Sequence, residues 1–164
     1  MTNPAKFTST ISQTLSASER ARVGLWLRIA RVYNLAMRDL RASLRDECTM
    51  PQFDVLAQLN RSPEGLTFSA LSERLLVTAG NLTGIVDRLE KLGLAKRETN
   101  PRDRRQIFIR LTEKGHEYCN KVIPQHEAEI VRVFAGISEN TVVNLRADLD
   151  ALAAALDRHP QPKA

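Results

Sequence analysis

Cysteine and aromatic residues are scarce in this chain, and long apolar runs are missing. Its 164 residues include two cysteines, Cys48 and Cys119, too few for a disulfide framework and without the close spacing of metal ligands. Aromatic residues make up 5%, which leaves Leu and Ala, both good helix formers, to build the core. No stretch approaches the length of a transmembrane helix, and the N-terminus lacks the apolar segment of a secretory signal. We therefore expect a cytoplasmic protein with reduced thiols.

Motifs of enzyme active sites are also missing. Gly80 and Gly84 fall within a predicted helix, so they form no phosphate loop, and neither Ser-x-x-Lys nor Gly-x-Ser-x-Gly occurs. His116 and His126 are ten residues apart, whereas two metal ligands on one helical face need a spacing of about four. We interpret both, together with His159 in the tail, as surface histidines. We expect no enzyme activity, no metal site and no cofactor.

Positive charge is in excess and unevenly placed. The chain has 24 Lys and Arg against 19 Asp and Glu, a net charge of +5, which favours a polyanionic partner without choosing among DNA, RNA and a membrane surface. Residues 20–45 hold seven arginines and one acid, Asp39. From Glu113 to the end, acids outnumber bases eight to six.

Apolar spacing predicts a mainly helical fold with one small β-hairpin. The first predicted helix, from residue 17 or 18 to about 46, would be about 40 Å long, more than a small domain can bury, so we expect part of it to pack on a second chain. Further helices are predicted over residues 49–60, 67–75, 78–92, 112–134 and 138–157.

Two strand-like segments, 94–98 and 106–111, follow the helix 78–92, and the turn between them is rich in arginine. Residues 78–112 carry eight Lys and Arg against four Asp and Glu. A short helix, a turn and a second helix with small polar residues outward, followed by a basic hairpin, is the order of a winged helix-turn-helix. The alternative is a solvated hairpin beside a surface helix.

Four segments resemble the MarR (multiple antibiotic resistance regulator) family of bacterial winged-helix regulators. They are GNLTGIVDRLE at residues 80–90, Gly93-Leu94, NPRDRR at residues 100–105 and LTEKG at residues 111–115. The resemblance implies a homodimer that binds double-stranded, pseudopalindromic DNA, acts as a repressor and responds to an aromatic acid or an aryl-coenzyme A thioester.

This resemblance also suggests how the chain is divided. We expect residues 1–17 to form a mobile N-terminal arm and residues 49–113 to form the winged helix-turn-helix. Residues 18–48 and 114–158 would then form a helical dimerisation layer.

The start of the helix 78–92 is the predicted base-reading end. Asn81 can form paired hydrogen bonds to adenine, and Thr83 can reach a thymine methyl group or a phosphate. Gly80 would allow close approach of a groove. Thr78 would bind a phosphate or only cap the helix, and Arg88 would bind a phosphate or only be a surface charge.

Asp103 and Arg105 match the D-x-R pair of the family's wing. The carboxylate can orient the guanidinium for insertion into a narrow minor groove, or the pair can be a salt bridge that shapes the turn. Arg102 and Arg104 are predicted phosphate contacts.

The first helix supplies the predicted effector site. Trp26 and Tyr33, seven residues apart, could stack an aromatic ring, or both could be only core or dimer-interface residues. Guanidinium groups that could bind a carboxylate or phosphates come from Arg22, Arg31, Arg38 and Arg45. So many arginines favour a larger anion such as a coenzyme A thioester, and the alternative is a solvated face.

Two other functions stay open. Cys48 and Cys119 could report oxidation, but Asp46 and Glu47 beside Cys48 raise a thiol pKa, which disfavours this. The chain could also be a nonspecific nucleoid or RNA-binding protein. Its affinity for any one sequence would then be about equal to its affinity for others, a specificity ratio near unity.

Overall fold

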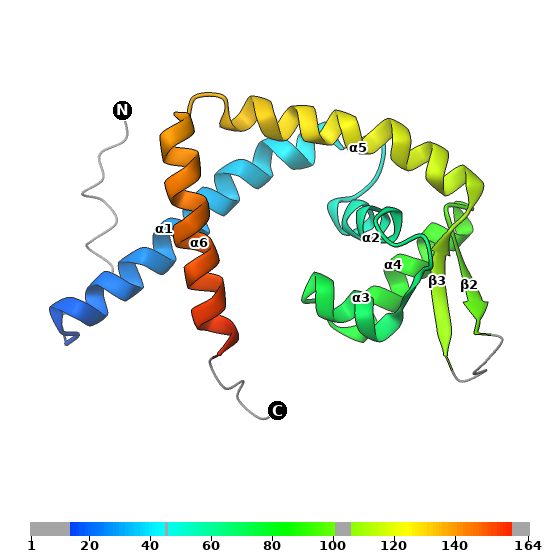
Figure 1. Ribbon diagram of the computed structural model, residues 1–164, viewed down its shortest axis with the longest axis horizontal. Helices are drawn as coiled ribbons and strands as arrows, with labels where there is room; N and C mark the ends of the chain where they lie inside the picture. The colour runs from blue at the N-terminus through cyan, green and yellow to red at the C-terminus, as the bar shows by residue number, and fades with distance from the viewer. Residues whose placement is uncertain (1–13, 45, 101–105, 159–164) are drawn as a thin grey trace.

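The computed structural model describes residues 14–44, 46–100 and 106–158. In chain order the elements are α1 (Ala17–Ser43), α2 (Met50–Asn60), β1 (Leu66–Thr67), α3 (Phe68–Leu75), α4 (Ala79–Lys91), β2 (Ala95–Thr99), β3 (Ile107–Leu111), α5 (Glu113–Phe134) and α6 (Glu139–Asp157). The predicted class, mainly helical with a small β-hairpin, is confirmed. Figure 1 shows the winged helix-turn-helix at one end and α1, α6 and most of α5 beside it.

The sheet has one strand more than the sequence predicts. Its order is β1-β3-β2, and both pairings are antiparallel. Leu66 pairs with Ile109, and Ala95 pairs with Leu111. β1 has only two residues, too few for an alternating pattern to be recognised.

Side-chain caps explain where the helices begin and end. Ser16 and Glu19 form a capping box at α1, so the helix is capped just before the Ala17–Ser18 start that the sequence indicates. The Thr112 hydroxyl accepts a hydrogen bond from the Gly115 N–H at the start of α5. After α4, Gly93 has a φ of 71°, the left-handed conformation predicted to stop the helix.

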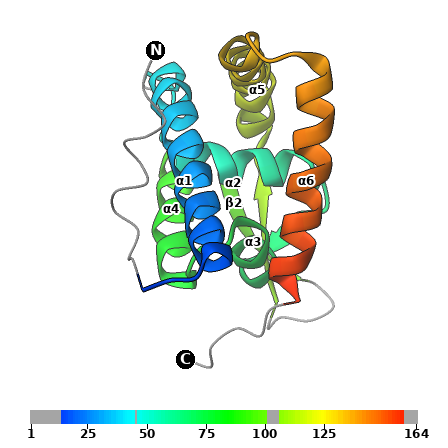
Figure 2. The same cartoon turned by 90° about the vertical axis from the view of Figure 1, so that its left-hand side faces the viewer.

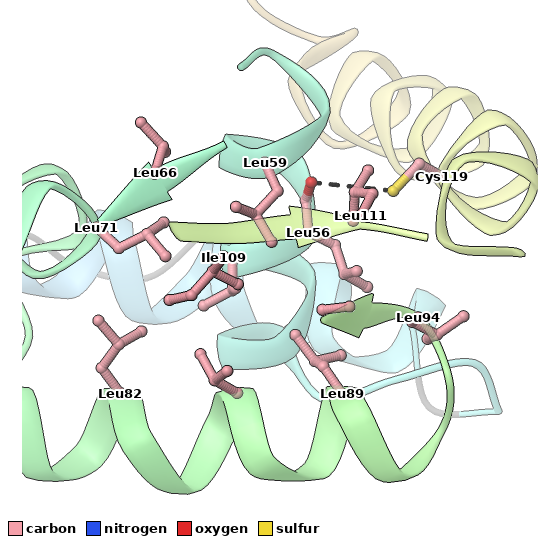
Figure 3. Packing of buried hydrophobic residues seen from close by; sticks show 13 residues of the cluster. Leu56, Leu59, Leu66, Leu71, Leu82, Leu89, Leu94, Ile109, Leu111 and Cys119 are labelled. Carbon is pink, nitrogen blue, oxygen red and sulfur yellow. Dashed lines mark hydrogen bonds between the residues drawn. The ribbon is translucent and has the colours of Figure 1, made fainter. Parts of the chain in front are cut away.

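One apolar core lies between the helices and the sheet of the winged domain (Figure 3). Its fully buried side chains include Leu56, Leu59, Leu71, Leu82, Val86, Leu89 and Ile109. Burial of each such side chain stabilises the fold by about 1.5–3 kcal/mol. The core therefore fixes α4 to α2, α3 and β3.

A second cluster joins this domain to the long helices. Leu44, Phe53 and Val122 are buried together, which ties the end of α1 to α2 and α5. α6 has no buried residue, and Figure 2 shows it standing apart from α1. Within the described residues, no helix has the length and apolar character needed to cross a membrane.

Candidate nucleic-acid interface

α4 has one buried face and one exposed polar face. Leu82, Val86 and Leu89 are fully buried, whereas Asn81 and Thr83 are exposed. The exposed side of the same turn includes Gly80, and a Cβ there would meet nothing within 4 Å. Asn81 and Thr83 are two residues apart, about 200° around the helix, so they lie at the two edges of the exposed face, with Gly80 between them. All three are open to solvent.

The other predicted DNA contacts on α4 are exposed as well. Thr78 is the N-cap residue, but its side chain makes no capping hydrogen bond. Arg88 lies along its own helix, because its Nε donates to the Gly84 carbonyl oxygen at 3.1 Å. Neither side chain is needed to hold the core.

Arg97 on β2 connects the wing to α4. Its Nη2 lies 2.7 Å from Asp87 Oδ1, and its Nη1 forms an ion pair with Glu90. The Arg97 backbone N–H also donates to Glu90 Oε1 at 2.9 Å, and its guanidinium lies 5.2 Å from the centre of the Phe68 ring. Sequence reasoning missed this residue, although two acids three residues apart on one helix face indicate a basic partner.

The base of the wing is closed by Asn100 and Gln106. The Asn100 N–H donates to the Gln106 carbonyl oxygen at 2.9 Å, and their side chains form a second hydrogen bond of 3.0 Å. Below them, Arg110 pairs with Glu98 at 3.0 Å and donates to the Pro63 carbonyl oxygen. These contacts fix the strands on both sides of the tip.

The predicted wing contacts themselves, Arg102, Asp103, Arg104 and Arg105, lie outside the described residues. Their assignment remains a prediction from the sequence.

The start of α5 is held tightly against the turn between α4 and β2. A Cβ on Gly115 would lie 2.0 Å from the Leu94 carbonyl oxygen, so only glycine fits there. The Thr112 hydroxyl donates to the Gly93 carbonyl oxygen at 2.6 Å, and Lys114 Nζ donates to the Leu92 carbonyl oxygen at 2.8 Å. These contacts hold the start of α5 against the end of α4.

Leu76, in the turn between α3 and α4, has an unusual conformation. Its φ and ψ of 52° and 38° place it in the left-handed region, which costs a residue with a Cβ about 1–2 kcal/mol. It is the one non-glycine residue with positive φ among those the structure describes. Its side chain is 93% exposed, so no apolar burial offsets that cost.

A hollow of about 540 Å³ lies where α1 ends and α2 begins. The residues that line it are Arg38, Arg41, Ala42, Cys48, Thr49, Met50 and Pro51. Two guanidinium groups beside apolar side chains suit an organic anion, and the volume lies in the range of small-molecule sites. Arg41 was not predicted, although it stands one helical turn from Arg38.

The predicted effector residues do not all meet in this hollow. Arg38 lines it, Arg45 lies outside the described residues, and Trp26 and Tyr33 are 65% and 57% exposed on another part of α1. Trp26 precedes Arg31 by five residues, about 140° around a helix, and Tyr33 precedes Arg38 by the same step. Arg31 and Arg38 thus lie on a different side of α1 from the aromatic pair. Arg22, four residues before Trp26, is on the aromatic side and is exposed.

His126 is not the surface histidine that the sequence suggested. It is 5% exposed, lies 4.3 Å from the Phe53 ring centre, and its Nδ1 is 3.4 Å from Ser43 Oγ. Burial lowers its pKa, against the opposing effects of Asp54, Glu129 and Glu127. The prediction was wrong because α1, α2 and α5 converge on this residue, which periodicity along α5 alone does not reveal.

The cysteines are poor nucleophiles. Burial, with smaller contributions from Glu47 and Asp54, raises the pKa of Cys48, in the direction predicted from its acidic neighbours. Burial raises the pKa of Cys119 to about 11. Neither thiol therefore has the low pKa of a reactive cysteine.

Comparison with known proteins agrees with this geometry. Residues 49–106 match the model of the MarR family. An uncharacterised HTH-type transcriptional regulator, YkoM of Bacillus subtilis, is 36% identical over 122 residues, which cover 73% of this chain and 77% of YkoM.

Solved structures show the same architecture. AbsC, a MarR family regulator from Streptomyces coelicolor, has a TM-score of 0.78 at 26% identity and covers 90% of this chain and 100% of its own. A cysteine-to-serine mutant of E. coli MarR in complex with operator DNA has a TM-score of 0.74 at 25% identity. The match covers 84% of this chain and 99% of the MarR chain. CouR from Rhodococcus jostii, bound to p-coumaroyl-CoA, shares the fold with a TM-score of 0.69 at 22% identity. The match covers 79% of this chain and 91% of CouR. The chain belongs to the MarR family of winged helix-turn-helix transcriptional regulators.

Proposed function

We propose that this regulator is a cytoplasmic homodimer that represses transcription by binding a pseudopalindromic DNA site. The observation that carries the proposal is the division of α4 into a fully buried apolar face and an exposed face with Gly80, Asn81 and Thr83. Small and hydrogen-bonding side chains on an exposed helix allow it to enter the major groove and reach base edges. The neighbouring wing would place Arg102, Arg104 and Arg105 near phosphates or the minor groove.

The long helices support the dimer. Large apolar side chains are exposed on α1, α5 and α6, among them Leu25, Trp26, Val32, Val131, Phe134, Leu145 and Leu149. Exposed large apolar side chains on three neighbouring helices are typical of a protein interface, so we assign them to contacts with a second copy of the chain. Two-fold symmetry would then set the recognition helices about one DNA turn apart, roughly 34 Å, or a multiple of it.

We assign the effector to the hollow at the junction of α1 and α2. Arg38 and Arg41 would bind a carboxylate or phosphate, and Met50 and Pro51 would contact an apolar ring. CouR, whose fold this chain shares, is bound to an aryl-coenzyme A thioester, which supports an effector of this class. Because α2 packs on both α4 and α5, a ligand there can favour one spacing of the recognition helices over another.

The test begins with selection of bound fragments from genomic DNA. The protein, measured by light scattering at micromolar concentration, should be a dimer, and the selected site should show two related half-sites. Binding should favour this site over a scrambled duplex by about 10³ or more at the same salt concentration. A ratio near unity would instead support a nonspecific nucleoid protein, and a monomer would contradict the symmetric arrangement.

A further inference from the structure

Leu76 is the C-cap of α3, where a left-handed residue ends the helix, but a leucine in this position is both strained and exposed. Among the large apolar side chains described, it is the most exposed, at 93%. It also holds a left-handed backbone conformation, which glycine adopts without strain. The conformation closes the helix, so what calls for a functional reason is the use of an exposed leucine here instead of glycine.

The turn around Leu76 is firmly held. The Ser72 hydroxyl donates to the Val77 carbonyl oxygen at 2.5 Å, and the Val77 N–H donates to the Ser72 carbonyl oxygen at 3.2 Å. The Leu76 N–H donates to the Glu73 carbonyl oxygen at 3.4 Å. Its Cα–Cβ bond therefore leaves the turn in a fixed direction.

Leu76 borders a shallow hollow that reaches the beginning of α4. The lining residues are Phe68, Ser69, Ser72, Glu73, Leu76, Val77 and Thr78. Thr78 is the N-cap of α4, so this hollow adjoins the end of the helix that carries Asn81. The charged residue in its lining is Glu73, whose carboxylate would repel a phosphate. An apolar group suits this place better than an anion.

We propose that Leu76 determines specificity by contacting the 5-methyl group of a thymine at one position in each half-site. This rests on the proposed function, in which α4 enters the major groove. The thymine methyl is the apolar group that base pairs display there. Because the turn is fixed, Leu76 can meet that group without further ordering of the backbone. Glycine would relieve the strain but provide no contact.

Replacement of each thymine of the selected site by deoxyuridine tests this directly, because it removes only the methyl group. At one position per half-site, wild-type affinity should fall about fivefold, as expected for loss of one buried methyl contact. Leu76→Gly should bind the thymine and deoxyuridine duplexes equally, with the affinity that wild type has for deoxyuridine. Leu76→Asn, which also tolerates the left-handed region, should behave like the glycine variant.

The melting temperature separates contact from folding. Leu76→Gly should melt at the wild-type temperature or above it, because it removes backbone strain. The inference is wrong if wild type and Leu76→Gly lose the same affinity when deoxyuridine replaces thymine at every position of the site. If wild type itself does not distinguish the selected site from a scrambled duplex, the proposed function fails, and this inference fails with it.

Discussion

Arg97 Nη2 lies 2.7 Å from Asp87 Oδ1, which joins the first strand of the wing to the recognition helix. The same guanidinium pairs with Glu90 and lies over the Phe68 ring. With 29% of its side chain exposed, Arg97 is shielded enough for these contacts to hold a defined geometry. We conclude that Arg97 positions α4 relative to the wing without itself needing to touch DNA.

Replacement of Arg97 by methionine should therefore loosen this link. We expect the free energy of unfolding to fall by about 1–2 kcal/mol in urea titrations, because two carboxylates lose their partner. A double-mutant cycle with Asp87→Asn should show that Arg97 and Asp87 stabilise the fold through their mutual interaction. Lys96→Met is the matched control, because Lys96 on the same strand pairs with Glu98 in a more exposed position. Equal loss in both variants would show that Arg97 has no special role.

Gly115→Ala should destabilise the protein because its Cβ would collide with the Leu94 carbonyl oxygen. A loss of about 3 kcal/mol is expected, since backbone rather than a flexible side chain must move. Gly136→Ala provides the comparison, because a Cβ there meets nothing within 4 Å. Thermal melts that show no difference between the two variants would contradict the close packing of α5 on the turn.

Stability should fall as the pH drops from about 7.5 to 5. His126 has a lowered pKa in the folded state, so the unfolded chain, with a histidine pKa near 6.5, binds the proton first. Asp54 opposes this at the acid end, because burial raises its pKa. The slope between about pH 7 and 5 should flatten in His126→Gln and persist in His116→Gln, which changes an exposed histidine on the same helix. If the slope is unchanged in His126→Gln, groups other than His126 cause the loss of stability at low pH.

Effector binding distinguishes the hollow from the rest of α1. In calorimetric titrations with an aromatic acid and its coenzyme A thioester, Arg41→Ala should weaken binding about tenfold or more, the effect of losing a charged hydrogen bond. Arg31→Ala, a change outside the hollow, should leave binding unchanged. The reverse pattern would favour the arginine face predicted from the sequence. Equal binding by all three proteins would mean that neither site holds the ligand.

The sequence predicted α4 and the hairpin well because their signals are local. Leu82, Val86 and Leu89 repeat at helical spacing, and Gly93 stops the helix where expected. β1 could not be predicted in this way, since Leu66 is defined as a strand residue only by its pairing with Ile109, about forty residues further along. Such pairings depend on the assembled domain rather than on local pattern.

The candidate site shows the same limit. Asn81 and Thr83 could be assigned from the exposed face of one helix, whereas Arg97 joins α3, α4 and β2. The burial of His126 likewise depends on side chains from α1 and α2. Arg41 became a candidate ligand residue only when the end of α1 was placed beside the start of α2.

The most direct test of DNA recognition by α4 is the affinity of Asn81→Ala for the selected site relative to a scrambled duplex. Wild type and variant are compared by fluorescence anisotropy at one salt concentration. If Asn81 reads a base, the variant should lose about 1–3 kcal/mol on the selected site and accept other bases at one position, with nonspecific affinity unchanged. Arg88→Ala should instead weaken both duplexes alike and reduce the salt dependence. A specificity ratio in Asn81→Ala equal to that of wild type would contradict the placement of α4 in the major groove.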